Sequence, residues 1–198
     1  MGNYCEDGSV HPTAERLLRA TEELLHEQGQ TRISLRDITE RAGANVAAVS
    51  YHFRSKDALV EETFRRALEE VTEQRRRQLA TLAPDADLRD VVRTWLAPAL
   101  DPSSQDPREA QLWALIARGM REEAPGLGAA VGSVSAGVDD ELFALLTRHL
   151  PHLDADEVRV RHTATLAALS SRTVSPDDAE LLLDWVVAGL SGPGRTSR

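Results

Sequence analysis

Residues 33–59 read ISLRDITERAGANVAAVSYHFRSKDAL, and this stretch decides the fold. Apolar residues recur at helical spacing on both sides of Gly43, which interrupts the pattern. The spacing predicts two short helices, 35–41 and 46–52. Their inward positions are Leu35, Ile38, Ala42, Val49 and Phe53. Helices of two turns are marginal in isolation, so they need a packing partner such as the longer apolar-faced segment 13–28.

Polar residues mark where these helices begin. Ser34 followed by Asp37 predicts a cap before the first short helix, and Asn45 predicts one before the second. Two short helices joined by a glycine-containing turn and packed on a longer one describe a helix-turn-helix. The pattern alone leaves a generic helical hairpin open as the alternative.

Helical patterns continue through the rest of the 198 residues, and no run of alternating β-branched residues suggests a sheet. The sequence predicts about nine helices in all. They are 13–28, 35–41, 46–52, 56–81, 86–100, 107–123, 127–149, 155–171 and 176–191. Three later starts carry cap signals: Asp106 with Pro107 and Glu109 as a capping box, Asp154 with Glu157, and Ser175 with Pro176.

Composition limits the class of protein. A single cysteine, Cys5, excludes an internal disulfide and favours the cytoplasm. No apolar run approaches the roughly 20 residues that a membrane span needs. The opening MGNYCEDGSV has no signal-peptide core and is interpreted as a disordered leader.

Charge is distributed unevenly along the chain. The net charge is −9, which seen alone argues against a nucleic-acid partner. Residues 30–56, however, carry five basic side chains against only Asp37 and Glu40. A local positive patch on an acidic protein is compatible with a surface that binds phosphate, although mixed solvated charge is a common alternative.

The segment RISLRDITERAGANVAAVSYHFRSKDALVEETF, residues 32–64, resembles the DNA-binding domain of the TetR family of transcriptional regulators. The features are SLRDI opening the second helix, the AG turn, YHF closing the third helix and SKDAL opening the fourth. The resemblance spans residues 14–65. It implies an all-α protein with four parts: a disordered leader (1–10), a three-helix DNA-binding domain (11–56), a larger helical effector-binding and dimerisation domain (57–192) and a flexible tail (193–198).

The resemblance also implies which residues touch DNA. Helix 46–52 would lie in the major groove of a double-stranded operator. Arg36 would reach a base edge, while Tyr51, His52 and Lys56 would hold phosphates. The full expected set is Ser34, Arg36, Asn45, Val46, Ala47, Ala48, Ser50, Tyr51, His52 and Lys56. One departure from many relatives is that the residues at 46–48 have no hydrogen-bonding side chain, so they can contact only thymine methyl groups.

The C-terminal helices are expected to supply a dimer interface and an effector pocket. Helix 176–191 is apolar on most of its circumference, and helix 155–171 is rich in small residues. The expected interface residues are Leu166, Leu182, Trp185, Val186 and Leu190. The expected pocket residues are Trp95, Trp113, Met120, Phe143 and His162. For both sets, packing in the core of the monomer is the alternative.

No enzyme is expected, because the sequence has no P-loop, no G-x-S-x-G and no H-E-x-x-H. His149 and His152 flank Pro151 and do not share a helical face, so neither a metal nor another cofactor is expected. The prediction is a one-component regulator, expected to be a repressor. It would bind a pseudo-palindromic operator as a homodimer and be released by a small molecule. The alternative is a helical ligand-binding or interaction module without specific DNA binding.

Overall fold

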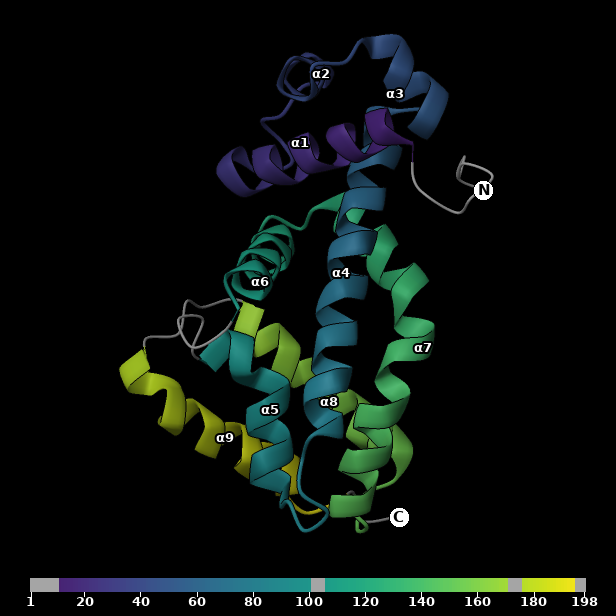
Figure 1. Cartoon of the computed structure of the whole chain (residues 1–198). Helices are drawn as coiled ribbons and strands as arrows, with labels where there is room; N and C mark the ends of the chain where they lie inside the picture. Colours follow the sequence, from purple (N-terminus) through teal and green to yellow (C-terminus); the bar gives the residue numbers. More distant parts are fainter. Residues whose placement is uncertain (1–10, 101–105, 171–175, 195–198) are drawn as a thin grey trace. The chain divides into compact units, whose positions relative to one another are not determined.

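The computed structural model describes residues 11–100, 106–170 and 176–194, without the side chains at 98–99, 132–141, 170 and 176. Every regular element in these ranges is helical (Figure 1). The elements are α1 (Pro12–Gln28), α2 (Leu35–Ala42), α3 (Val46–Phe53), α4 (Lys56–Ala80), α5 (Leu88–Leu100), α6 (Pro107–Arg121), α7 (Pro125–His149), α8 (Ala155–Ser170), the 3-10 turn η2 (Pro176–Asp178) and α9 (Ala179–Ser191). The all-α class expected from the sequence is confirmed.

The helix starts test the predicted caps. Asp154 accepts the N–H of Glu157 at 2.8 Å, as expected. Asp106 caps α6 by accepting the N–H of Arg108 at 2.8 Å, but the capping box is not closed. The side chain of Glu109 instead accepts a hydrogen bond from the Gln78 amide at 3.1 Å. The Glu109 carboxylate is buried, and its hydrogen bond is with Gln78 of α4 and not with the backbone at the start of α6.

Three expectations fall at residues that the structure does not describe. The disordered leader (1–10), the cap at Ser175 and residues 195–198 of the tail lie outside the described residues. At the start of the last helix the chain forms η2 first, and α9 begins only at Ala179, without a side-chain cap.

The chain divides into two compact units. The first consists of Met1–Glu69 with Ala114–Val134, and the second of Glu70–Trp113 with Ser135–Arg198. Helices α4, α6 and α7 therefore contribute residues to both. These packing units do not coincide with the expected division at residue 56, which remains a prediction about function.

The first unit is organised around α1, which packs against α2 and α3. Apolar residues from α1 to α4, with others from α6 and α7, fill its core. The largest fully buried side chains are Leu17, Leu25, Ile38, Leu59, Phe64, Leu115 and Ile116. The end of α6 joins this unit: the Arg118 guanidinium donates to the carbonyl oxygens of His26 and Glu27, at 2.9 and 3.3 Å. This guanidinium satisfies carbonyls that the last turn of α1 leaves without helical partners.

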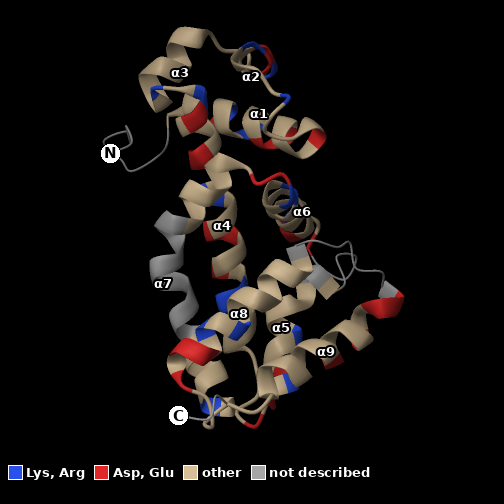
Figure 2. Ribbon diagram, turned by 180° about the vertical axis from the view of Figure 1, so that it is seen from behind, with Lys and Arg blue, Asp and Glu red and all other residues tan. Residues whose placement is uncertain are grey.

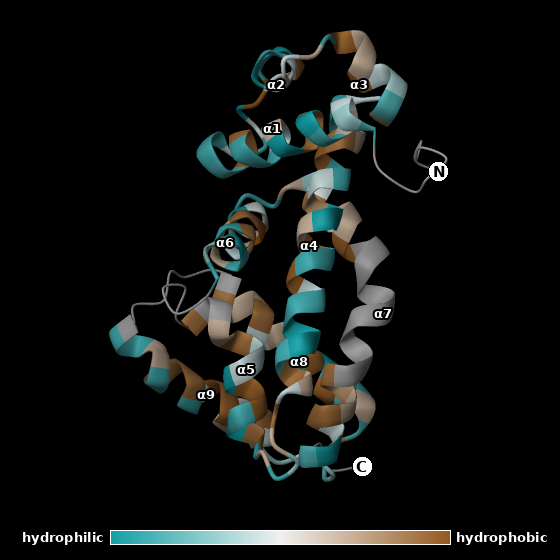
Figure 3. Cartoon of the chain, in the orientation of Figure 1, coloured by the Kyte–Doolittle hydropathy of each residue, from teal (hydrophilic) through white to brown (hydrophobic). Residues whose placement is uncertain are grey.

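The second unit has a core built mainly from α5, α7, α8 and α9, where apolar residues are dense (Figure 3). Trp95 is its largest buried side chain. At the surface, Arg89 and Arg93 on α5 pair with Glu180 on α9, and Arg89 also pairs with Asp184. These hydrogen bonds, led by the one from Arg93, lower the pKa of Glu180 to about 2. The pairs fix α9 against α5 around an apolar seam.

Candidate nucleic-acid interface

The turn between α2 and α3 is held by local bonds at both helix ends. A reciprocal capping box closes the start of α2: the Asp37 N–H donates to Ser34 Oγ at 3.2 Å, and the Ser34 N–H donates to Asp37 Oδ2 at 2.8 Å. Gly43 ends α2 in the left-handed region, at φ 57° and ψ 42°. A side chain is disfavoured in that conformation, although no atom would lie within 4 Å of an added Cβ. The glycine therefore sets the direction in which α3 leaves.

The third helix presents one face to the core and the other to solvent. Asn45 caps it by accepting the Ala48 N–H at 2.9 Å, and Val49 is buried. On the outer face, Val46 is 50 % exposed and Tyr51 is 69 % exposed. Helix α3 contains no acidic and no Lys or Arg residue, so its ribbon is tan in Figure 2, the colour of residues of other types. A helix of this kind can approach DNA without repelling its phosphates.

The expected DNA-contacting residues are brought to this outer face with some differences in detail. Asn45, Val46, Ala47, Ser50 and Tyr51 are exposed, whereas Ala48 and His52 are partly buried. The side-chain oxygen of Asn45 accepts one bond in the cap, and its side-chain NH2 group makes no bond in that cap and can donate to a base. The role of each residue in contacting DNA remains a prediction.

Two cationic side chains are already engaged within the protein. Arg36 is exposed and pairs with Glu40 at 2.7 Å, and this hydrogen bond raises the pKa of Arg36. The Lys56 ammonium donates to the carbonyl oxygen of Ile33 at 3.0 Å. Lys56 thus ties the start of α4 to the segment before α2, and its other N–H donors remain for a phosphate.

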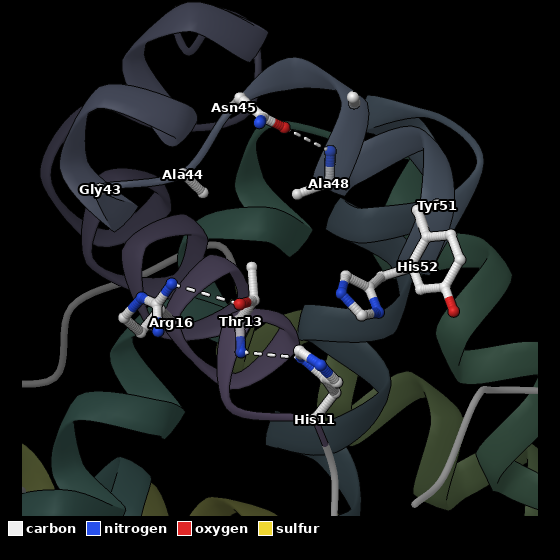
Figure 4. Close-up of a pocket in the computed structure, with 10 residues that line it drawn as sticks. His11, Thr13, Arg16, Gly43, Ala44, Asn45, Ala48, Tyr51 and His52 are labelled. Carbon is white, nitrogen blue, oxygen red and sulfur yellow. Dashed lines mark hydrogen bonds between the residues drawn. The ribbon is translucent and has the colours of Figure 1, made fainter.

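A groove lies between the start of α1 and α3 (Figure 4). Its volume is about 630 Å³. The lining residues are His11, Thr13, Arg16, Gly43, Ala44, Asn45, Ala47, Ala48, Tyr51 and His52. No role was expected from the sequence for His11, which caps α1, or for Thr13 and Arg16 in its first turns. Their local spacing carries no signal for a site, since only the packing of α1 on α3 brings them beside His52.

In the second unit, three of the expected pocket residues are in ring contact, and their role in binding an effector remains a prediction. The His162 ring stacks on Trp95 at 4.7 Å and meets the edge of Phe143 at 5.0 Å between ring centroids. Burial, aided by the nearby charges of Arg75 and Arg159, lowers the pKa of His162 to about 4. The imidazole is therefore neutral at neutral pH.

The remaining two expected pocket residues are Trp113 and Met120. The Arg75 guanidinium lies over the Trp113 ring, 4.5 Å from its centroid. Met120 belongs to the first unit, so it is not grouped with the others. Near Trp113, Glu109 is 1 % exposed, and burial raises the pKa of its carboxyl. A polar group of this kind in an apolar interior is a feature of binding sites as well as of cores.

The expected dimer residues divide between two faces of α9. Val186 and Leu190 lie in the core of their own unit, together with Leu183. This burial favours, for Val186 and Leu190, the alternative of packing in the core of the monomer, and the interface itself remains a prediction. The opposite face carries Trp185 and Leu181, which are 56 % and 71 % exposed. Leu166 and Leu182 are partly buried.

Two further observations concern other classes of protein. Among residues 11–100, 106–170 and 176–194, no three or more His, Cys, Asp or Glu side chains are placed to hold a metal ion. Within the same ranges, no helix combines the length and the apolar run that crossing a membrane requires.

Comparisons with known proteins address the first unit most directly. Residues 17–63 match the sequence model of bacterial regulatory proteins of the tetR family. The match contains α2, the glycine turn and α3, together with the residues of α1 and α4 that bury them. A comparison with curated proteins found no match.

Solved structures match nearly the whole chain. A candidate TetR-family transcriptional regulator from Rhodococcus sp. is 18 % identical, with 92 % of this chain and 100 % of that chain covered and a TM-score of 0.67. A candidate transcriptional regulator from Pseudomonas aeruginosa PAO1 is 20 % identical, with coverages of 90 % and 89 % and a TM-score of 0.65. One from Streptomyces coelicolor A3(2) is 23 % identical, with coverages of 91 % and 99 % and a TM-score of 0.61. These likenesses establish the fold along the chain.

The helix-turn-helix geometry, the family match over residues 17–63 and the shared all-α fold agree with one another. Residues 17–63 therefore belong with the tetR family of bacterial regulatory proteins, and the chain as a whole has the fold of the transcriptional regulators it is similar to.

Proposed function

We propose that this protein binds a pseudo-palindromic operator as a homodimer, acts in the cytoplasm as a one-component repressor, and leaves the operator when a small molecule binds its second unit. The single observation that supports operator binding is the solvent-exposed face of α3, held outward by the buried Val49 and free of acidic residues. One α3 helix offers few contacts. The DNA-binding domains (residues 11–56) of two copies, here called heads, would lie about 34–36 Å apart and join two half-sites into one operator.

The surface of α9 supports the dimer. Trp185 and Leu181 are large apolar side chains that one copy of the chain leaves exposed, as is Val160 on α8. Exposed aromatic residues of this size are typical centres of protein interfaces. A two-fold pairing would bury the same surface on both copies.

The aromatic cluster supports an effector site. Trp95, Phe143 and His162 combine flat apolar surfaces with one polar ring, which suits an organic molecule. An effector can release DNA only through a difference in its affinity for the free and DNA-bound forms. A tenfold release requires about 1.4 kcal/mol of coupling. By reciprocity, operator DNA must weaken effector binding by the same factor.

The outer face of α3 also predicts how the operator is recognised. Val46 and Ala47 can recognise thymine through its methyl group but cannot form paired hydrogen bonds with a base. DNA shape would supply the remaining preference. Recognition should therefore be unusually sensitive to thymine methyl groups.

The experiment is selection of genomic DNA fragments with the purified full-length protein, followed by affinity measurements on the enriched site. A pseudo-palindrome is the expected result. Replacing a contacted thymine by uracil removes one methyl group and should weaken binding about fourfold, as expected for about 0.8 kcal/mol per buried carbon. Failure to enrich any sequence would refute operator binding and leave a helical interaction module as the explanation.

A further inference from the structure

The groove between α1 and α3 is lined by one arginine and no acidic residue, although the protein as a whole is acidic. The chain has a net charge of −9, yet none of the described residues that line the groove is acidic. The charged or titratable side chains in the lining are His11, which caps α1, Arg16 of α1, and Tyr51 and His52 of α3. The turn between the helices contributes only small or neutral residues. A groove of this composition suits an anion.

Arg16 supplies the permanent positive charge. Its Nε donates to the carbonyl oxygen of Ala42 at 3.2 Å, and one terminal nitrogen donates to the Thr13 hydroxyl at 3.2 Å. These bonds hold the guanidinium at the groove, as Figure 4 shows for the bond to Thr13. A guanidinium has five N–H donors, so these two bonds do not exhaust it.

The two histidines are in ring contact, with centroids 4.8 Å apart. His11 caps α1: its Nδ1 accepts the Thr13 N–H at 3.2 Å. An imidazole that accepts at Nδ1 carries its proton on Nε2, so the Nε2–H of His11 is a hydrogen-bond donor. Partial burial, and secondly the neighbouring His11, lower the pKa of His52. His52 is therefore neutral in the free protein at neutral pH, and a nearby anion would favour its protonated form.

We propose that this groove binds a phosphate of the DNA backbone and that His52 takes up a proton when it does so. The inference rests on the proposed DNA binding and adds a site on α1 and a chemical linkage to it. A phosphodiester is negative at all physiological pH values, and an opposite charge at hydrogen-bonding distance favours the imidazolium form. His11 Nε2 and Arg16 donate to the same anion.

The sign of the effect follows from the order of proton binding. Because DNA-bound His52 holds its proton more tightly than free His52, affinity for DNA rises as the pH falls. The rise begins below the pKa of the bound form and levels off below that of the free form. Each unit of difference between the two pKa values corresponds to a tenfold change in affinity. We expect about tenfold per head between pH 8 and pH 5.5, assuming a difference of about one unit.

Phosphate contacts do not depend on base sequence, so a short duplex of arbitrary sequence is a sufficient probe. Its affinity for the full-length protein would be measured by fluorescence anisotropy from pH 5.5 to 8 at constant low ionic strength. His52→Gln removes the titrating group, and we expect it to abolish most of the pH dependence. His26→Gln removes an exposed imidazole of the same unit that does not line the groove, and it should leave the pH dependence in place.

A second readout separates proton uptake from a structural effect of the substitution. NMR titration of the His52 ring, with and without the duplex, should show a higher pKa when DNA is bound. An equal pKa in both states would overturn the proposal, as would a pH dependence that survives in His52→Gln. If the duplex binds with the same affinity at every pH, the phosphate linkage fails while DNA binding stands. If no duplex binds at any pH and low salt, the proposed function fails with it.

Discussion

His162 should make the protein sensitive to mild acid. The ring is 5 % exposed and stacks on Trp95, with Phe143 at its edge and with Arg75 and Arg159 near enough to repel a positive charge. Its pKa is about 4 in the folded protein, compared with an ordinary 6.5. Above pH 6.5, both the folded and unfolded chains hold the neutral ring. As the pH falls from 6.5 towards 4, only the unfolded chain gains the proton, so stability is lost in this window.

The magnitude follows from the size of the shift. A difference of this size corresponds to about 3 kcal/mol in full and to about 2 kcal/mol between pH 7 and pH 4.5, at 1.36 kcal/mol per pKa unit. Urea unfolding followed by circular dichroism at these two pH values would measure the loss. His162→Leu has no titrating group and should lose about 2 kcal/mol less than the wild type, because carboxylates contribute equally to both proteins.

An exposed histidine provides the control. His26→Gln should lose as much stability between the two pH values as the wild type. If His162→Leu and the wild type lose the same amount, the buried imidazole does not control the acid response, and the reasoning from its stacking and burial is refuted.

Other substitutions test the DNA-binding head and the dimer. Arg36→Ala should relax the preference at one base pair per half-site by about 1–3 kcal/mol in competition binding; unchanged preferences would remove Arg36 from base recognition. Lys56→Ala should weaken binding to all sequences about equally. It should also lower the free energy of unfolding by about 1 kcal/mol, since its ammonium holds the Ile33 carbonyl; a change in the preferred sequence would contradict this role. Trp185→Ser should weaken the dimer by about 2 kcal/mol or more in analytical ultracentrifugation, and an unchanged dimer would place the interface elsewhere.

The head could be predicted because its signals are local. The caps at Ser34 and Asn45 and the left-handed turn at Gly43 are specified by residues within three positions of one another. Alternating burial on short helices follows from the same spacing. The sequence therefore identifies α2, α3 and the outward face of α3 before any tertiary contact is known.

Features that depend on tertiary packing could not be predicted in this way. His11 and Arg16 become part of a groove only because α1 crosses α3, and Glu109 turns inward only because Gln78 of α4 meets it. The case of α9 is similar: its apolar residues surround most of the helix, so the pattern does not tell the core face, with Val186, from the face that bears Trp185.

The central claim is that the outer face of α3 contacts DNA, and one substitution tests it most directly. Ala47→Glu places a carboxylate on that exposed face while leaving the caps and the buried Val49 unchanged. Thr147→Glu, on an exposed position of α7, is the matched control for the change in net charge. Affinity for the selected operator would be measured for both variants, after circular dichroism has shown that each is folded. We expect Thr147→Glu to bind within a few-fold of the wild type and Ala47→Glu to bind about 100-fold more weakly, because a buried like-charge contact costs about 3 kcal/mol. Equal operator affinity of Ala47→Glu and the wild type would contradict the central claim.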